Sequence, residues 1–152
     1  VVRSLPNILN ITIEEFKPFA IWQNDDEQFF TDKNGKLVPY ENIEEYKYMV
    51  ILSGKNANNN VSSLFNIFFA DPDLSAKVYS ANWVSNRRWD IRLEDGTLVK
   101  LPEENISEAW QSLKKLYETP GSMIGIKLID LRISNKIYLE YNDTISKEIR
   151  EL

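Results

Sequence analysis

Two adjoining segments of the chain alternate apolar and polar residues with the two-residue period of β-strands. Every second residue is apolar in 89–93, and the alternation resumes in 97–101. A two-residue loop would turn the apolar face of the second strand away from the core. A three-residue loop, 94–96, instead pairs Ile91 with Val99 on one apolar face. The pattern therefore predicts a hairpin with a three-residue loop.

The same alternation marks another hairpin near the C-terminus, in residues 129–133 and 137–141. The register that keeps a single apolar face pairs Ile133 with Ile137 and leaves residues 134–136 as the loop. We expect this hairpin to form the last strand pair of the sheet.

Two further segments have the spacing of amphipathic helices. In the first, apolar residues at i, i+3, i+4 and i+7 begin at Val61, and Asp71-Pro72 ends the helix. In the second, Asn105 and Glu108 form a capping-box-like start, and residues 119–121 end the helix. The apolar stripe of the second helix is Ile106, Ala109, Trp110, Leu113 and Tyr117.

The N-terminal part consists of short strand-like segments. Residues 1–5 and 8–16 predict two strands joined at Pro6-Asn7, and residues 19–23 predict a further extended stretch. The acidic residues 24–27 are the best candidate for a domain boundary.

Three more predictions concern the region that follows. Residues 28–38 predict a hairpin around 32–35, where asparagine and glycine tolerate positive φ. Residues 48–52 predict a strand, and residues 56–60 a loop that supplies a helix N-cap. The last residues, from 142, are a charged tail.

Composition narrows the chemistry. The 152 residues contain no histidine and no cysteine, which excludes Ser-His and Cys-His nucleophiles, thiolate zinc sites and disulfides. The formal net charge of −5 argues against nucleic-acid binding, which needs a basic face. A chain of this length normally forms one domain with its own core. No run of the sequence reaches the ~20 apolar residues of a membrane span.

A few residue groups remain as candidates for binding. The acidic clusters are typical of solvated surfaces, with the general acid and base of a carboxylate-only hydrolase as the alternative. The glycines do not form a phosphate-binding loop. Arg87 and Arg88, with Arg92 on the same strand, form a local basic patch. Such a patch is either a partner site for carboxylates or a solvated strand start. Trp22 and Trp83 lie on no predicted core face and leave sugar stacking open.

Four motifs follow one another along the chain. They are Val2-Arg3-Ser4-Leu5-Pro6-Asn7 with Glu15, Pro18, Ala20 and Trp22; Asp32 to Gly35; Arg87 to Leu93 with Asp95-Gly96; and Leu116-Tyr117 with Ile129-Asp130-Leu131-Arg132. In order and spacing they resemble the extracytoplasmic part of the bacterial cell-division family FtsQ, called DivIB in Gram-positive bacteria. The resemblance runs from Val2 to about Tyr141, with Leu5 in place of the tryptophan usual before the proline.

The resemblance implies an α+β fold with a curved, mainly antiparallel sheet, two main helices packed on one face, and a preceding remnant hairpin of an α/β POTRA domain. Residues 1–23 would close that POTRA domain, 24–143 would form the β domain, and 144–152 the C-terminal tail. It also implies a full-length protein anchored in the inner membrane by one N-terminal span absent from this chain. This part would lie in the periplasm at the division septum.

The implied function is that of a non-enzymatic divisome scaffold with no cofactor, no metal and no nucleic-acid partner. Family members bind FtsB (DivIC), itself paired with FtsL, by strand addition at the last strand of the β domain. An exposed terminal edge is otherwise an aggregation hazard. The alternative is a periplasmic carbohydrate- or peptidoglycan-binding module that uses Trp22 or Trp83.

The resemblance also assigns partner contacts. Arg132 matches an arginine that pairs with an acidic residue of the partner, and Tyr141 stands where a tryptophan anchors it. Lys136 falls in a turn where glycine is common, and positive φ would be unfavourable for a lysine. The expected partner-binding residues are Arg132, Ile133, Asn135, Lys136, Ile137, Leu139 and Tyr141, with Arg87 or Arg88 as a second charge contact.

Overall fold

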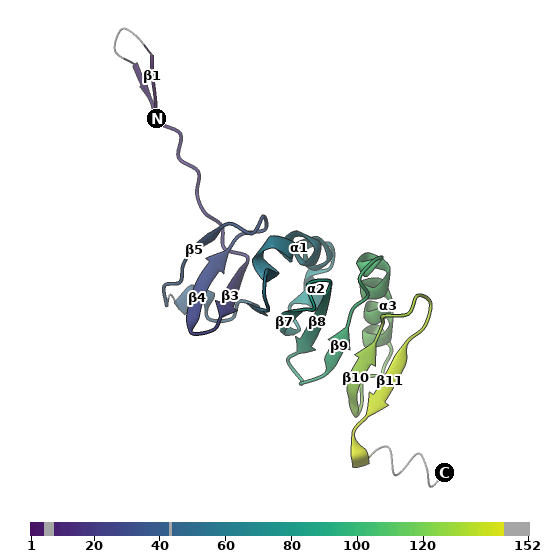
Figure 1. Ribbon diagram of the computed structural model, residues 1–152. Helices are drawn as coiled ribbons and strands as arrows, with labels where there is room; N and C mark the ends of the chain where they lie inside the picture. Colours follow the sequence, from purple (N-terminus) through teal and green to yellow (C-terminus); the bar gives the residue numbers. More distant parts are fainter. Residues whose placement is uncertain (5–7, 43, 145–152) are drawn as a thin grey trace.

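The computed structural model describes residues 1–4, 8–42 and 44–144, and its main feature is a large sheet (Figure 1). Its strands are β3 (Ala20–Asn24), β4 (Glu27–Thr31), β5 (Leu37–Pro39), β6 (Ile51–Ser53), β7 (Val78–Val84), β8 (Arg88–Leu93), β9 (Leu98–Lys100), β10 (Ile126–Asp130) and β11 (Tyr138–Tyr141). Their spatial order is β11-β10-β9-β8-β7-β6-β3-β4-β5. The pairs β3–β6, β6–β7 and β9–β10 are parallel and the others antiparallel, which confirms a mainly antiparallel sheet.

The helices pack on one face of this sheet. The main ones are α1 (Val61–Ala70) and α3 (Ile106–Glu118), and the short elements are α2 (Pro72–Ser75) and two 3₁₀ turns, η1 (Glu44–Tyr46) and η2 (Ala57–Asn60). The rings of Phe68 in α1 and Trp110 in α3 lie 5.4 Å apart. Lys114 Nζ of α3 lies 3.2 Å from the carboxylate of buried Asp71, the residue that follows α1. The predicted α+β architecture with two main helices is confirmed.

The face beneath the helices is the core. One row of cross-strand neighbours from β6 to β10 is completely or almost completely buried: Leu52, Ala81, Ile91, Val99 and Ile129. Burying such side chains removes apolar surface from water, which is the dominant favourable contribution to folding.

The opposite face of the sheet carries charged side chains. The next row consists of the cross-strand neighbours Asn82, Asp90, Lys100 and Asp130. Opposite charges on neighbouring strands attract one another across the sheet. Lys100 lies between the two aspartates, so this face presents alternating charges next to β10.

The β8–β9 hairpin has the predicted three-residue loop. Ile91 pairs with Val99, and the Leu93 N–H donates to the Thr97 carbonyl at 2.9 Å. Gly96 adopts a φ of 90°, which the last position of such a loop requires. The parity of the hydrophobic pattern and the glycine of the loop together therefore predicted this register correctly.

The acidic residues 24–27 are the turn of a hairpin, so their interpretation as a domain boundary is wrong. Asp25-Asp26 joins β3 to β4, and Gln23 pairs with Gln28 across the turn. β3 also pairs with β6, so the large sheet begins at Ala20. Asp25 has a φ of 51°, which aspartate tolerates better than most residues.

The first strands form a separate small hairpin, which stands apart from the large sheet in Figure 1. β1 (Val2–Ser4) pairs antiparallel with β2 (Ile8–Asn10). The predicted second strand, 8–16, is longer than β2, because residues 11–16 pair with none of the described strands and Ile13 is 87% exposed. The assignment of this hairpin to a POTRA domain stays a prediction.

The predicted helix caps are wrong in detail. Residues 57–60 form η2 instead of an open loop, and Asn60 makes no side-chain cap bond to α1. Asn105 precedes α3 with a φ of 57° and likewise makes no side-chain cap bond. The predicted strand 48–52 is shorter and begins at Ile51. The predicted tail lies, beyond residue 144, outside the described residues.

Candidate partner-binding edge

The large sheet has two edge strands, β5 and β11, and β5 is poorly suited to pairing with a further strand. Tyr40 N–H donates to the Gln28 carbonyl, so the backbone polar groups of Val38 and Tyr40 point toward β4. Those of Leu37 and Pro39 point outward, away from the sheet. Because Pro39 has no N–H, the outer edge of β5 has no donor at that position.

The edge formed by β11 has no such block. Leu131 N–H donates to the Lys100 carbonyl of β9, so the backbone N–H and C=O of Ile129 also point toward β9. Those of Asp130 point toward β11. Leu139 lies opposite Ile129 and therefore turns its N–H and C=O away from β10. Among the described strands, none pairs with this outer edge.

The register of the last hairpin differs from the predicted one by two residues. Leu139 pairs with Ile129, not with Leu131. The pairing with the parallel strand β9 explains the difference. Leu131 N–H bonds to the Lys100 carbonyl of β9, and the pairing of β10 with β11 ends at Asp130, one residue earlier. A shift of two residues keeps every side chain on its predicted face.

The loop that follows β10 resolves the expected difficulty at Lys136. Asn135 takes the left-handed conformation, with a φ of 61°, and Lys136 does not. Lys136 N–H donates to the Ile133 carbonyl at 3.2 Å and closes the turn. Asparagine tolerates this conformation better than lysine, so the sequence suits the turn as it stands.

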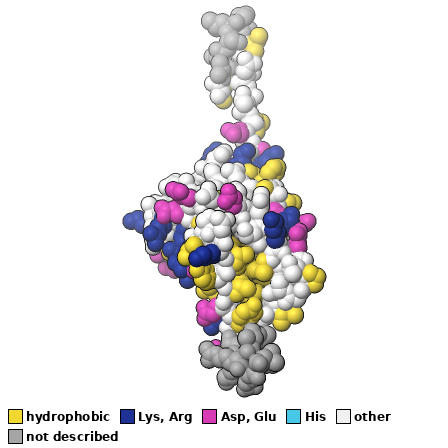
Figure 2. All heavy atoms as spheres, turned by 90° about the vertical axis from the view of Figure 1, so that its right-hand side faces the viewer, with side chains coloured by type: hydrophobic (Ala, Val, Ile, Leu, Met, Phe, Trp, Pro, Cys, Tyr) yellow, Lys and Arg dark blue, Asp and Glu magenta, His cyan; other side chains and the backbone are white. Residues whose placement is uncertain are grey.

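Apolar side chains lie along this edge. Figure 2 shows hydrophobic side chains gathered on the side of the molecule where β11 lies in Figure 1. Leu139 and Tyr141 pack against the core and are half-buried. The exposed apolar residues in β11, in the loop before it and in the loop before β10 are Ile124 (68%), Ile133 (52%), Tyr138 (49%) and Ile137 (42%). An exposed group of this kind is typical of an interaction surface.

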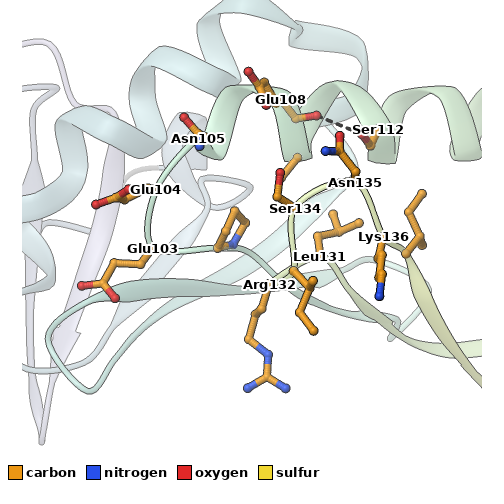
Figure 3. A pocket seen from close by; sticks show the side chains of 14 residues that line it. Glu103, Glu104, Asn105, Glu108, Ser112, Leu131, Arg132, Ser134, Asn135 and Lys136 are labelled. Atoms are coloured by element: carbon orange, nitrogen blue, oxygen red, sulfur yellow. Dashed lines mark hydrogen bonds between the residues drawn. The ribbon is translucent and has the colours of Figure 1, made fainter.

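A cavity of about 520 Å³ lies between the start of α3 and the loop 131–137. Ser134 and Asn135 point from the loop toward α3, whereas Arg132 extends to the other side (Figure 3). Five of the predicted partner-binding residues line this cavity: Arg132, Ile133, Asn135, Lys136 and Ile137. Its other wall was not predicted as part of the site and includes Glu103, Glu104, Asn105, Glu108 and Ser112.

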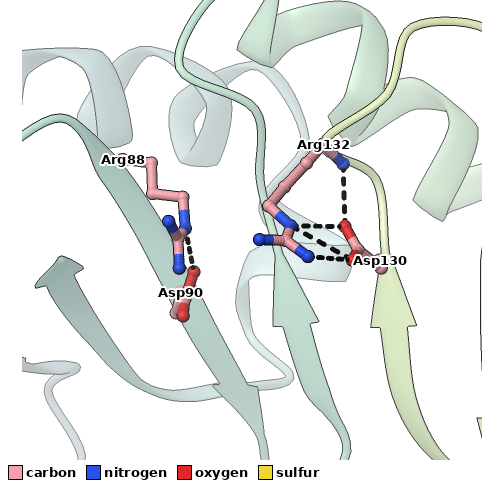
Figure 4. Close-up of polar contacts among 4 residues, drawn as sticks. All are labelled: Arg88, Asp90, Asp130 and Arg132. Carbon is pink, nitrogen blue, oxygen red and sulfur yellow. Dashed lines mark hydrogen bonds and ion pairs between the residues drawn. The ribbon is translucent and has the colours of Figure 1, made fainter. Parts of the chain in front are cut away.

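Arg132 forms an ion pair within the chain. Its Nε lies 2.9 Å from Asp130 Oδ1, its Nη2 lies 2.6 Å from Oδ2, and its backbone N–H donates to Oδ1 at 3.0 Å (Figure 4). The Arg132 side chain is 44% exposed and that of Asp130 17%. The pairing of Asp130 with Arg132 was not predicted from the sequence, although Asp-x-Arg on a strand places both side chains on one face.

One comparison identifies the family. A family model described as "Cell division protein FtsQ/DivIB, C-terminal" matches residues 20–132. This chain belongs to the FtsQ/DivIB family. The start of the match coincides with β3, the first strand of the large sheet.

Relatives agree with this assignment. The chain is 35% identical over 141 residues to the cell division protein FtsQ of Rickettsia bellii, covering 92% of this chain and 52% of that protein. It is 30% identical over 157 residues to FtsQ of Novosphingobium aromaticivorans, covering 99% and 49%. The chain thus spans about half the length of these relatives. The major extracytoplasmic domain of Geobacillus stearothermophilus DivIB aligns with a TM-score of 0.46 and 14% identity, covering 72% of this chain and 92% of that one.

Within this FtsQ/DivIB domain, the two candidate arginines at the start of β8 differ in availability. Arg88 Nε lies 3.0 Å from Asp90 Oδ1, and both side chains are largely buried, at 13% and 14% exposed (Figure 4). Arg87 is exposed in the turn before β8. Of the two, Arg87 is therefore the one accessible to a partner's carboxylate.

The two tryptophans considered for sugar stacking are both half-buried and hydrogen-bonded within the chain. Trp22 Nε1 donates to the Gly54 carbonyl, and Trp83 Nε1 donates to Asn86 Oδ1. Trp83 also packs on Trp89 at 5.0 Å.

None of the described acidic residues forms a group suited to hold a metal ion. No described helix is long and apolar enough to cross a bilayer.

The Asp130–Arg132 pair makes stability depend on pH. Hydrogen bonds from the Arg132 side chain lower the pKa of Asp130, against partial burial, which raises it. A lowered folded-state pKa adds stability that is complete above the ordinary carboxyl value of about 3.9 and is lost as the pH falls through the folded-state value. We expect the urea midpoint to fall more steeply below about pH 4 in the wild type than in Asp130→Asn. Equal slopes would contradict this.

Proposed function

We propose that this FtsQ/DivIB domain is a non-enzymatic scaffold of the bacterial divisome that binds FtsB (DivIC), paired with FtsL, by strand addition to β11. The observation that supports this best is the open outer edge of β11, with exposed Tyr138 in the strand and exposed Ile133 and Ile137 in the loop before it. In strand addition, main-chain hydrogen bonds supply affinity and alternate side chains supply specificity. The open edge of β11 offers the main-chain hydrogen bonds, and its apolar side chains offer the specificity.

Charge supports the same edge. Arg132 lies in the loop directly before β11, and its guanidinium is partly exposed. A carboxylate on the partner would form a charge-assisted hydrogen bond there. Arg87 supplies a further exposed cation at the start of β8.

The location of the protein belongs to the same proposal. The full-length protein would be held in the inner membrane by a single N-terminal span that precedes this chain. The domain would then lie in the periplasm at the division septum, where FtsB and FtsL would meet β11.

Main-chain hydrogen exchange tests strand addition directly. We expect the Leu139 amide, which faces outward, to exchange rapidly in the free chain and to become protected when the periplasmic segments of FtsB and FtsL from the same organism bind. The physical reason is that an added strand would accept a hydrogen bond from this N–H. Hydrogen exchange followed by NMR resolves this single amide.

The Leu37 amide on β5 is the matched control, because it faces outward on the other edge. Its exchange should stay unchanged on binding. Binding that leaves Leu139 as exposed as before would rule out strand addition at β11, and the absence of binding would refute the partner assignment.

A further inference from the structure

The contact between Asp130 and Arg132 uses one particular edge of the guanidinium. Asp130 Oδ1 accepts from Nε, at 2.9 Å, and Oδ2 accepts from Nη2, at 2.6 Å. Nε also lies 3.1 Å from Oδ2. This is the bidentate, side-on pairing of an arginine with a carboxylate.

The side-on pair leaves the end of the guanidinium unused. An arginine has five N–H donors, and those on Nη1 make no hydrogen bond with any residue that the structure describes. Nη1 and the remaining hydrogen of Nη2 together form a second fork that matches a second carboxylate. One arginine can therefore bind two carboxylates at once.

Asp130 is itself firmly held. Its side chain is only 17% exposed, it accepts the Arg132 backbone N–H, and Lys100 lies beside it on β9. Asp90 lies beyond Lys100 on β8 and is held by Arg88. The charged residues around Arg132 on the sheet face opposite the helices, Asp130, Lys100 and Asp90, thus lie on paired strands and not in loops.

We propose that Asp130 is a positioning residue, which occupies the side-on edge of Arg132, orders the guanidinium and leaves its end-on Nη1/Nη2 fork free for a carboxylate of the partner that adds a strand to β11. The inference rests on the proposed function and deepens it. An arginine that is ordered before binding loses less side-chain freedom when it binds.

The opposite effect is also physically reasonable, and the two differ in sign. If Asp130 mainly competed with the partner's carboxylate, its removal would free Arg132 and tighten binding. If Asp130 positions Arg132, its removal weakens binding, although the surface becomes more positive. The sign of the change therefore decides between positioning and competition.

A double-mutant cycle measures this effect with the periplasmic segments of FtsB and FtsL as the probe. We expect Asp130→Ala to raise Kd about 10-fold, mainly through faster dissociation, and Asp130→Asn to have a smaller effect, since its amide oxygen still accepts one bond. In an Arg132→Ala background, Asp130→Ala should change Kd less than about 2-fold. Tighter binding of Asp130→Ala, or an equal loss in both backgrounds, would overturn the inference.

NMR of the free chain tests the positioning itself. The ¹⁵Nε–¹H signal of Arg132 should be resolved in the wild type and lose its distinct position in Asp130→Ala. An unchanged signal would overturn the inference whatever the binding data show. If the wild type did not bind the probe, the proposed function and the partner half of this inference would both fail, while the signal would still report on the pair within the chain.

Discussion

Replacing Arg132 by glutamate should abolish measurable binding of the FtsB and FtsL segments while the domain stays folded. Removing one member of a hydrogen-bonded charge pair at an interface costs at least about 2 kcal/mol, or about 30-fold in Kd, and reversal of the charge adds repulsion. In the free domain Arg132 is 44% exposed, so loss of its pair with Asp130 should cost at most about 1 kcal/mol. Isothermal titration calorimetry and thermal unfolding measure the two quantities.

Arg92→Glu is the matched control for this experiment. It makes the same change in charge on β8, at the other end of the strand from Arg87. Among the residues that the structure describes, the exposed Arg92 bonds only to the Gly96 carbonyl. Its affinity should stay within a few-fold of the wild type. An equal loss in both variants would mean that net charge, and not the position of Arg132, governs binding.

The largest effect on stability is expected for Trp89→Ala. Trp89 is 1% exposed, packs on Trp83 and donates its indole N–H to Ser63 Oγ at 3.2 Å. Truncation of a buried tryptophan typically costs about 3–5 kcal/mol, through lost burial and the cavity that remains. Urea unfolding at equilibrium gives the free energy of unfolding.

Phe69→Ala provides the comparison, because this ring on α1 is 77% exposed. The free energy of unfolding should then change by at most about 0.5 kcal/mol. A similar loss in both variants would contradict the assignment of Trp89, and not Phe69, to the core.

The sequence allowed prediction of a register only where a clear loop signal accompanied the side-chain parity. In the β8–β9 hairpin, Asp95-Gly96 marks the loop and a loop one residue shorter turns the apolar face outward, so the loop signal and the parity together fixed the pairing of Ile91 with Val99. In the last hairpin, a shift of two residues preserves parity, so the pattern did not distinguish the pairing of Leu139 with Ile129 from that with Leu131. The deciding bond runs to a parallel neighbour, β9, which local sequence does not reveal.

β7 was not predicted from the pattern for a related reason. A bulge between Val78 and Ser80 shifts the register, so the buried residues Val78 and Ala81 are three apart instead of two or four. A pattern with a period of two does not detect a strand of this kind. Its position in the sheet follows only from its neighbours β6 and β8.

The candidate site was predicted in part. The resemblance assigned Arg132, Ile133, Asn135, Lys136 and Ile137 to a partner surface, and the structure brings these residues together around one cavity. It did not distinguish Arg87 from Arg88, because this depends on which side chain the strand turns toward Asp90. The α3 wall of the cavity was missed because residues 103–112 read as a helix start and its solvated charges.

Pro39 has a consequence for stoichiometry. A sheet that accepted strands at both edges could join one chain to the next and grow without limit. Here β5 has a proline at an outward position, whereas β11 has none. Strand addition would therefore give complexes of one partner strand per domain that end there, and the number of FtsB chains recruited would follow the number of these domains.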